Sequence, residues 1–306
     1  MSLLIISPGT NPEVWKKAIH EQDASLKIEI YPEVKKPQAV EFALTWKHPH
    51  GVFQDFSNLK LIASMGAGID HIMKDPHLPK NVDITRVVDE KLTADMSLFA
   101  LALVLDELRD ISFHHCSKSW NKRGYKRPED VNIGIMGLGV LGLATAERLL
   151  GNGFKVRGWA NSEKDIEDIE TFCGKQQLDT FLEQTNFLIC LLPLTPETEN
   201  ILDKNLLQKL PKDAYLINVA RGSLLVEEDL VEMIKSEHLS GASLDVFRQE
   251  PLPEDHPFRS NEKIKITPHN ASITSPRSVA PQIVDNYRRM QNNMPLRNKV
   301  SRKKGY

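Results

Sequence analysis

The chain has 306 residues, 39 Lys and Arg against 41 Asp and Glu, and a formal net charge of −2. This balance excludes the strongly basic surface that is typical of nucleic-acid-binding proteins, so no nucleic-acid partner is expected. No apolar run approaches the ~20 residues that a membrane helix needs, so no membrane partner is expected either. Three cysteines without CxxC spacing and an N-terminus without a basic leader predict a cytoplasmic protein with no disulfide framework.

The first third of the chain alternates short apolar runs with amphipathic stretches. The apolar runs at 3–6, 26–30, 42–46 and 59–64 are predicted to be strands. Between the first two, Asn11-Pro12-Glu13 opens a helical stretch, with proline in the first turn, where its missing N–H costs little. Strands separated by helices imply a parallel sheet with crossovers, so this segment is predicted to be a small α/β unit.

The remainder of the chain begins with a long apolar helix from about Leu92. Residues 97–105 are apolar on nearly every face, so the helix is expected to be buried, with a second subunit as one candidate neighbour. The polar stretch 119–125 is predicted to be a loop or linker. A second α/β series then has predicted strands at 132–136, 154–159, 187–191, 215–219, 242–246 and 264–267, and a final helix at 278–290.

A glycine-rich loop, GLGVLG at 137–142, lies between the first strand and the first helix of this second series. Gly137 permits a tight turn, Gly139 lets backbone N–H groups approach a pyrophosphate, and Gly142 allows the helix to pack closely on the strand. The helix N-terminus adds unpaired N–H donors for the anion. A tight turn without a ligand is the alternative, but the next strand completes the βαβ unit of a dinucleotide site.

The tip of that next strand bears on the choice of cofactor. An NAD-selective site carries Asp or Glu there to bind the ribose 2′-hydroxyl, whereas this chain has Ala160. Asn161, Ser162 and Lys164 offer donors and one positive charge to a 2′-phosphate. The sequence therefore favours NADP(H) over NAD(H), with the alternative that Glu163 reaches the ribose of NAD(H).

Three residues that suit reduction of a 2-oxo acid follow three neighbouring predicted strands. Arg221, Glu250 and His269 should meet at one rim, because ligands bind beyond the carboxyl ends of parallel strands. An arginine fork can hold a carboxylate and point at the adjacent carbonyl oxygen. A histidine can protonate that oxygen as hydride reaches the carbon, and a neighbouring carboxylate fixes the imidazole tautomer. Singly, each residue has a structural explanation; together they predict a catalytic group.

Four motifs resemble those of the D-2-hydroxyacid dehydrogenase family. They are GLGVLG at 137–142, NVARG at 218–222, LDVFRQEPLP at 244–253 and TPHNA at 267–271. More narrowly, the chain is similar to the bacterial glyoxylate/hydroxypyruvate reductases of the A type at Leu44-Thr45-Trp46, at the non-acidic tip 159–162 and at Gly305-Tyr306. It departs from them at Asn161, where that branch usually has an arginine.

The resemblance implies an α/β fold of two doubly wound parallel-sheet domains with a cleft between them. A flavodoxin-like substrate-binding domain would comprise 1–97 and 275–306, and a Rossmann dinucleotide-binding domain 98–274. It also implies an NADPH-preferring homodimer that acts on a small 2-oxo acid such as glyoxylate or hydroxypyruvate. The histidines at 48, 50, 114 and 115 lack the spacing of metal ligands, so no metal is expected.

The roles implied by the resemblance fall on residues that match the motifs. Arg221 would orient the substrate, Glu250 and His269 would form the acid–base pair, and Asp245 would contact the nicotinamide carboxamide. The implied cofactor-binding residues are Gly137, Gly139, Val140, Leu141, Gly142, Trp159, Ala160, Asn161, Ser162, Lys164, Leu192, Pro193, Val219, Ala220, Asp245 and Ala271. The implied substrate-binding residues are Trp46, Gly66, Ala67, Gly68 and Arg221. For Trp46, an ordinary place in the core is the alternative.

Two other functions are compatible with this sequence. Phosphoglycerate dehydrogenase is the enzymatic alternative, although such enzymes often carry an added regulatory domain for which this chain has no room. The other is an interaction protein that senses NAD(P)(H) on the same fold with little turnover, because fold alone does not determine function. The Arg–Glu–His set favours the reductase.

Overall fold

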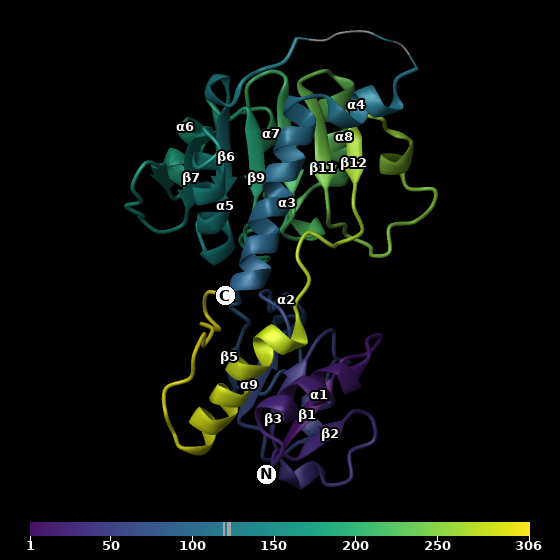
Figure 1. The fold of residues 1–306 in the computed structure, drawn as a ribbon, viewed down its shortest axis with the longest axis vertical. Coiled ribbons are helices and arrows are strands. Elements are labelled where there is room, and N and C mark those ends of the chain that lie inside the picture. Colours follow the sequence, from purple (N-terminus) through teal and green to yellow (C-terminus); the bar gives the residue numbers. More distant parts are fainter. Residues whose placement is uncertain (119, 121–123) are drawn as a thin grey trace. The chain divides into compact units, whose positions relative to one another are not determined.

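The computed structural model describes residues 1–118, 120 and 124–306 and divides the chain into two compact units (Figure 1). Unit 1 comprises Met1–Leu92 and Thr274–Tyr306, and unit 2 comprises Thr93–Ile273. The chain first passes from unit 1 to unit 2 within the first turn of helix α3 (Glu90–Leu108). Of the predicted loop 119–125, residues 119 and 121–123 lie outside the described residues.

Unit 1 is a five-stranded parallel sheet with the strand order β2-β1-β3-β4-β5. Its strands are β1 (Ser2–Ile6), β2 (Ile28–Ile30), β3 (Val40–Thr45), β4 (Leu61–Ser64) and β5 (Asp83–Thr85), and its helices are α1 (Pro12–Gln22), α2 (Asp70–Met73) and α9 (Pro276–Gln291), with short 3-10 turns η1 (Pro37–Ala39) and η2 (Val52–Asp55). The strand β5 was not predicted, because Ile84 is its one apolar residue and shows no period.

Alternation along β1 divides the core of unit 1 between the two faces of its sheet. Leu3 and Ile5 pack in the cluster that contains residues of α1 and α9, whereas Leu4 and Ile6 pack in the cluster that contains Phe53 of η2. Successive side chains of a strand point to opposite faces, so both faces of this parallel sheet are covered. The Asn11 side chain accepts a hydrogen bond from the N–H of Glu13 and so caps α1.

Unit 2 is a seven-stranded parallel sheet with the order β12-β11-β10-β9-β6-β7-β8. Its strands are β6 (Asn132–Met136), β7 (Lys155–Ala160), β8 (Glu170–Cys173), β9 (Phe187–Cys190), β10 (Ala214–Asn218), β11 (Leu239–Leu244) and β12 (Ile264–Ile266). The strand order reverses between β6 and β9, the switch point at which doubly wound sheets bind ligands. The predicted class, two doubly wound parallel sheets, is confirmed; β8 was missed.

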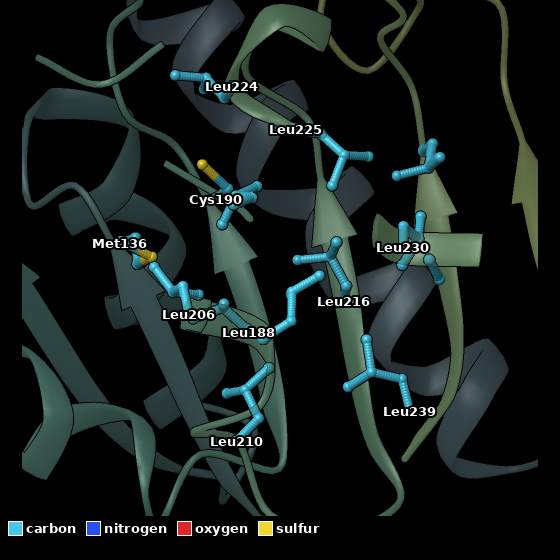
Figure 2. Close-up of a cluster of buried hydrophobic side chains, with 14 of the residues drawn as sticks. Met136, Leu188, Cys190, Leu206, Leu210, Leu216, Leu224, Leu225, Leu230 and Leu239 are labelled. Atoms are coloured by element: carbon cyan, nitrogen blue, oxygen red, sulfur yellow. The ribbon is translucent and has the colours of Figure 1, made fainter. Parts of the chain in front are cut away.

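Helices cover both faces of the sheet in unit 2. The α-helices after α3 are α4 (Ile111–Cys116), α5 (Val140–Leu150), α6 (Leu178–Leu182), α7 (Lys204–Leu207) and α8 (Glu227–Lys235), and the 3-10 turns are η3 (Pro128–Asp130), η4 (Lys175–Gln177), η5 (Gly222–Leu224) and η6 (Pro257–Ser260). Side chains of α3 and α5 share a core with Ile133 and Ile135 of β6. Side chains of α6, α7 and α8 share the other core with Met136 (Figure 2).

The core that contains side chains of α6, α7 and α8 extends to the edge of the sheet at which the strands end. Figure 2 shows Leu188 of β9 and Leu216 of β10 together with Leu224 and Leu225 from the segment after β10. Leu224 is fully buried, and each such leucine stabilises the fold by about 1.5–3 kcal/mol. The loop that follows Arg221 is thereby anchored in the core. Cys190 is buried here, and burial raises the pKa of its thiol to about 12, as suits an unreactive core residue.

The expectation that the apolar helix α3 is buried holds for only part of its surface. Val104 is fully buried, whereas Leu98 is 56% exposed. Among the described residues, no helix combines the length and apolar character required to cross a bilayer.

Candidate active site

The glycine loop joins β6 to α5 with little room on one side and open space on the other. Gly137 has φ +106°, and a Cβ on Gly142 would lie 1.8 Å from the carbonyl oxygen of Gly137. A Cβ on Gly139, in contrast, would meet no atom within 4 Å. The N–H groups of Leu138 and Gly139 meet no acceptor in the described residues. Together with the first turn of α5, this loop fits a pyrophosphate.

The tip of β7 is tied to the end of β8. Trp159 is buried, and its indole Nε1 donates to the carbonyl of Gly174 at 2.9 Å, while Gly174 N–H donates to the carbonyl of Ala160 at 3.0 Å. Trp159 thus supports the tip from within the core. Asn161 and Ser162 follow directly and are exposed, as is Lys164.

Glu250 and His269 are brought together from two different connections. Glu250 lies in the segment after β11, and His269 lies in the turn after β12. The His269 Nδ1 and the Glu250 Oε2 are 2.9 Å apart, with 36% of the His269 side chain and 24% of the Glu250 side chain exposed. The other carboxylate oxygen of Glu250 accepts a hydrogen bond from Phe247 N–H at 3.2 Å. The imidazole is therefore oriented through Nδ1, which leaves Nε2 to face a ligand.

A buried carboxylate shapes the turn that carries His269. Asp245 is 1% exposed and accepts hydrogen bonds from Thr267 Oγ1 at 2.6 Å, Asn270 N–H at 3.0 Å and Ala271 N–H at 2.9 Å. These bonds hold His269 in the left-handed region at φ +52°. A non-glycine residue pays a conformational cost there of order 1–3 kcal/mol, and such residues cluster at functional sites.

Arg221 is the residue that leaves β10 for the turn η5. Asn218, the last residue of β10, fixes this turn by donating to Arg221 O at 3.0 Å and accepting from Ala220 N–H at 3.2 Å. The Arg221 Nη1 donates to Ala220 O at 2.6 Å. The Arg221 side chain is half-buried at the edge where β11 and β12 also end.

Sequence reasoning missed a residue that ties the Arg221 segment to the Glu250 segment. Arg248 donates from Nε to Leu225 O at 2.9 Å, and its guanidinium also binds the side chain of Asn200. Its backbone N–H donates to Glu227 at 3.3 Å. In the sequence, the only indication of this role was an arginine two residues before Glu250. Its partner, the Leu225 carbonyl, lies more than 20 positions away, so the spacing of residues does not predict the contact.

The other implied cofactor residues also lie at strand ends on this edge. Leu192 and Pro193 follow β9, Val219 and Ala220 follow β10, and Ala271 lies after β12. Of these, Pro193 alone is classed as partly exposed rather than buried. Their place agrees with a cofactor lying along the carboxyl edge of the sheet.

The implied substrate residues Trp46, Gly66, Ala67 and Gly68 lie together in unit 1. A Cβ on Gly66 would lie 2.9 Å from the Trp46 ring, so glycine is needed for this approach. Trp46 also packs on His71 with 4.6 Å between ring centroids, and it is partly exposed rather than fully in the core. The N–H groups of Ala67 and Gly68 meet no acceptor among the described residues, as suits a turn that receives an anion.

Unit 2 thus holds an anion-binding glycine loop and, on the same edge, an arginine and a carboxylate-bound histidine. This arrangement can bind a dinucleotide and protonate an oxygen close to it. Within the part of the chain that is described, no three His, Cys, Asp or Glu side chains are placed to hold a metal ion.

Comparisons with known proteins show the family to which this chain is similar. The family model described as D-isomer specific 2-hydroxyacid dehydrogenase, NAD binding domain, matches residues 101–271. A protein named glyoxylate/hydroxypyruvate reductase A from Serratia proteamaculans is 35% identical over 94% of each chain. One of the same name from Photorhabdus laumondii is 34% identical over 100% of each chain.

Two solved structures are similar over nearly the whole chain. A D-isomer specific 2-hydroxyacid dehydrogenase from Xanthobacter autotrophicus Py2, in complex with NADPH and MES, has a TM-score of 0.95 and 37% identity, covering 100% of this chain and 99% of that one. An NADPH-dependent glyoxylate/hydroxypyruvate reductase from Sinorhizobium meliloti, in complex with NADP and sulfate, has a TM-score of 0.92 and 34% identity, covering 100% of both chains.

Proposed function

The chain belongs to the D-isomer specific 2-hydroxyacid dehydrogenase family, and we propose that it reduces a short 2-oxo acid, such as glyoxylate or hydroxypyruvate, to the 2-hydroxy acid with NADP(H). Unit 2 binds the dinucleotide, and unit 1 contributes to binding the substrate. The observation that carries the proposal is the 2.9 Å contact between His269 and Glu250 on the edge of the sheet that also carries the glycine loop.

Each residue of the catalytic group has a separate task. Arg221 holds the substrate carboxylate and points at the adjacent carbonyl oxygen, because its planar fork matches both. A bound reduced nicotinamide would supply the hydride for the carbonyl carbon. His269 gives its Nε2 proton to the carbonyl oxygen, while Glu250 at Nδ1 stabilises the protonated ring before transfer and fixes its orientation. In unit 1, Ala67 and Gly68 offer N–H donors that suit an anionic group.

The preference for NADP(H) follows from the tip of β7. Alanine at position 160 places no carboxylate there to repel a 2′-phosphate or to bind the 2′-hydroxyl of NAD(H). The two structural relatives are complexes with NADPH and with NADP. An Ala160→Asp variant should move the ratio of kcat/KM for NADPH over NADH toward NADH; an unchanged ratio would show that Ala160 does not lie beside the ribose.

A substrate panel with both reduced cofactors tests the activity itself. We expect absorbance of the reduced nicotinamide to fall when the protein is mixed with NADPH and glyoxylate or hydroxypyruvate, and to fall more slowly with NADH. No consumption across a range of short 2-oxo acids, with NADPH binding retained, would instead favour the dinucleotide-sensing interaction protein.

We further propose that two copies associate through the apolar surface of α3 and α4. Leu98 of α3 is 56% exposed, and Ile111 and Phe113 of α4 are 56% and 41% exposed, so both helices leave large apolar side chains uncovered. A Leu98→Glu, Ile111→Glu variant should elute as a monomer in light-scattering chromatography where the unchanged protein elutes as a dimer. A monomeric unchanged protein would refute the homodimer.

A cytoplasmic location agrees with the state of the cysteines. Cys116, Cys173 and Cys190 are all free in the structure, as is usual in a reducing compartment.

A further inference from the structure

We infer that Lys175, in the turn after β8, binds the adenosine 2′-phosphate of NADP(H). This rests on the NADP(H) preference proposed above and adds the residue that produces it. Lys175 is not among the residues that the motifs imply, because it follows β8, whereas the tip expected to contact the ribose ends β7.

The backbone places Lys175 beside the tip of β7. Strands β7 and β8 run parallel, with Ala160 paired to Cys173, so both end at the same edge of the sheet. Gly174 is then fixed to the tip twice, through its N–H to Ala160 O at 3.0 Å and through its carbonyl to Trp159 Nε1 at 2.9 Å. Lys175 is the next residue, and its long, flexible side chain can extend toward a group bound at Ala160.

The turn at Gly174 leaves Lys175 available to a ligand. Gly174 has φ +67°, and a Cβ there would meet no atom within 4 Å, so the space beside the turn is open. The side chain of Gln177 fixes the same turn by accepting from Cys173 N–H at 2.6 Å. Lys175 is exposed and forms no ion pair or side-chain hydrogen bond with any described residue.

The segment that joins β7 to β8 is mostly acidic. A cation that binds a phosphate at the tip of β7 is therefore expected to come from outside this segment. Residues 161–170 contain five acidic side chains and one lysine, Lys164. Of the five carboxylates, Glu170 is paired with Arg157 at 2.8 Å. The others would repel a doubly charged phosphate at close range.

Lys164 is the competing candidate for the same task. It lies between Glu163 and Asp165 in the sequence, so neighbouring carboxylates offset its charge, whereas Lys175 lies between Gly174 and Gln176. The Lys164 carbonyl accepts a hydrogen bond from Thr171 Oγ1 at 2.6 Å, which fixes its backbone at the second residue of β8, two positions short of its end. Lys175 therefore offers the less compensated charge nearer the tip.

Isothermal titration of the full-length protein with 2′,5′-ADP and with 5′-AMP tests this without turnover, because the two probes differ only in the 2′-phosphate. We expect the unchanged protein to bind 2′,5′-ADP more tightly. Lys175→Gln should weaken 2′,5′-ADP binding roughly tenfold or more, as expected for loss of a charged hydrogen bond, and leave 5′-AMP binding unchanged. Lys175→Arg should retain the preference, and added salt should reduce it.

Matched variants separate this residue from its neighbours. Lys155→Gln removes the same charge from the opposite end of β7 and should change neither affinity, while Lys164→Gln should have a smaller effect than Lys175→Gln. Undiminished preference for 2′,5′-ADP in Lys175→Gln, or a larger loss in Lys164→Gln, would overturn the role of Lys175. Equal binding of both probes by the unchanged protein would overturn the NADP(H) preference itself.

Discussion

Each unit of this protein contains a histidine bound to a carboxylate, but in opposite environments. In unit 1, His48 Nε2 and Asp75 Oδ2 are 3.2 Å apart and neither side chain is exposed. In unit 2, His269 and Glu250 are 2.9 Å apart and both side chains are partly exposed. The buried pair cannot meet a ligand without unfolding its surroundings, whereas the exposed pair lies where strands end.

The surroundings of the two pairs show what each one does. Asp75 also accepts hydrogen bonds from Gly51 N–H at 3.0 Å and His77 N–H at 2.9 Å, so it holds the loop after β3 together. Glu250 has backbone support on one side and an imidazole on the other. A histidine–carboxylate contact alone therefore does not identify an active site; exposure and position at a strand end support the site proposed at His269.

The largest expected difference between the two pairs is in turnover. His269→Ala should lower kcat by about 10²–10⁴-fold, the usual worth of general acid catalysis, while NADPH binding and thermal stability change little. Stopped-flow absorbance and fluorescence titration measure the two quantities. His77→Ala, which removes an exposed histidine from unit 1, is the control and should behave like the unchanged protein. Near-normal turnover in His269→Ala would remove this residue from the acid role.

A smaller loss of activity is expected when the planar guanidinium of Arg221 is replaced by the single ammonium group of lysine. Arg221→Lys should raise KM for the 2-oxo acid and lower kcat, together lowering kcat/KM roughly 10–100-fold, because one ammonium cannot bind carboxylate and carbonyl together. Steady-state kinetics at saturating NADPH measure both constants. Unchanged constants would mean that Arg221 does not hold the substrate.

For the buried pair, the expected effect is on folding. Asp75→Ala removes the acceptor of His48 and of two backbone N–H groups, so the free energy of unfolding should fall by about 1–3 kcal/mol. Glu250→Ala, at the exposed pair, should change it by less. Urea titrations of the two variants compare them directly, and a greater loss of stability in Glu250→Ala would contradict the contrast between the units.

The smallest expected effect is a pH dependence that arises from unit 1. Burial lowers the pKa of His48 below its ordinary value of 6.5, against the opposing hydrogen bond and charge of Asp75. The folded state therefore favours the neutral ring, so its contribution to stability is full above pH 6.5 and is lost as the pH falls below that value. Between pH 7.5 and 5.5, His48→Asn should lose less stability than the unchanged protein, by about 1 kcal/mol or less. Parallel pH profiles would contradict this assignment.

The sequence predicts some strands of this fold better than others. The strands that carry long apolar runs, such as those at 132–136 and 215–219, were predictable because their period and length are both clear. The three-residue β5 and the polar β8 were not, because tertiary pairing rather than local pattern makes them strands. The same limit hid Lys175, since its place beside Ala160 depends on the β7–β8 pairing.

At the candidate site, residue types and positions at strand ends could be predicted, but supporting contacts could not. The sequence indicates that Arg221, Glu250 and His269 lie at one rim of the sheet. It does not reveal that the Asp245 carboxylate holds the His269 turn or that Arg248 binds the carbonyl of Leu225. Those contacts join residues about 20 or more positions apart, and neither spacing nor composition specifies them.

A double-mutant cycle on the exposed pair tests the central claim most directly. If Glu250 acts by supporting His269, then kcat/KM of the Glu250→Gln, His269→Ala double variant should lie within about threefold of His269→Ala alone, because removal of the imidazole leaves the carboxylate nothing to support. If the two losses instead multiply, Glu250 and His269 act independently, and the acid–base pair proposed for this protein is contradicted.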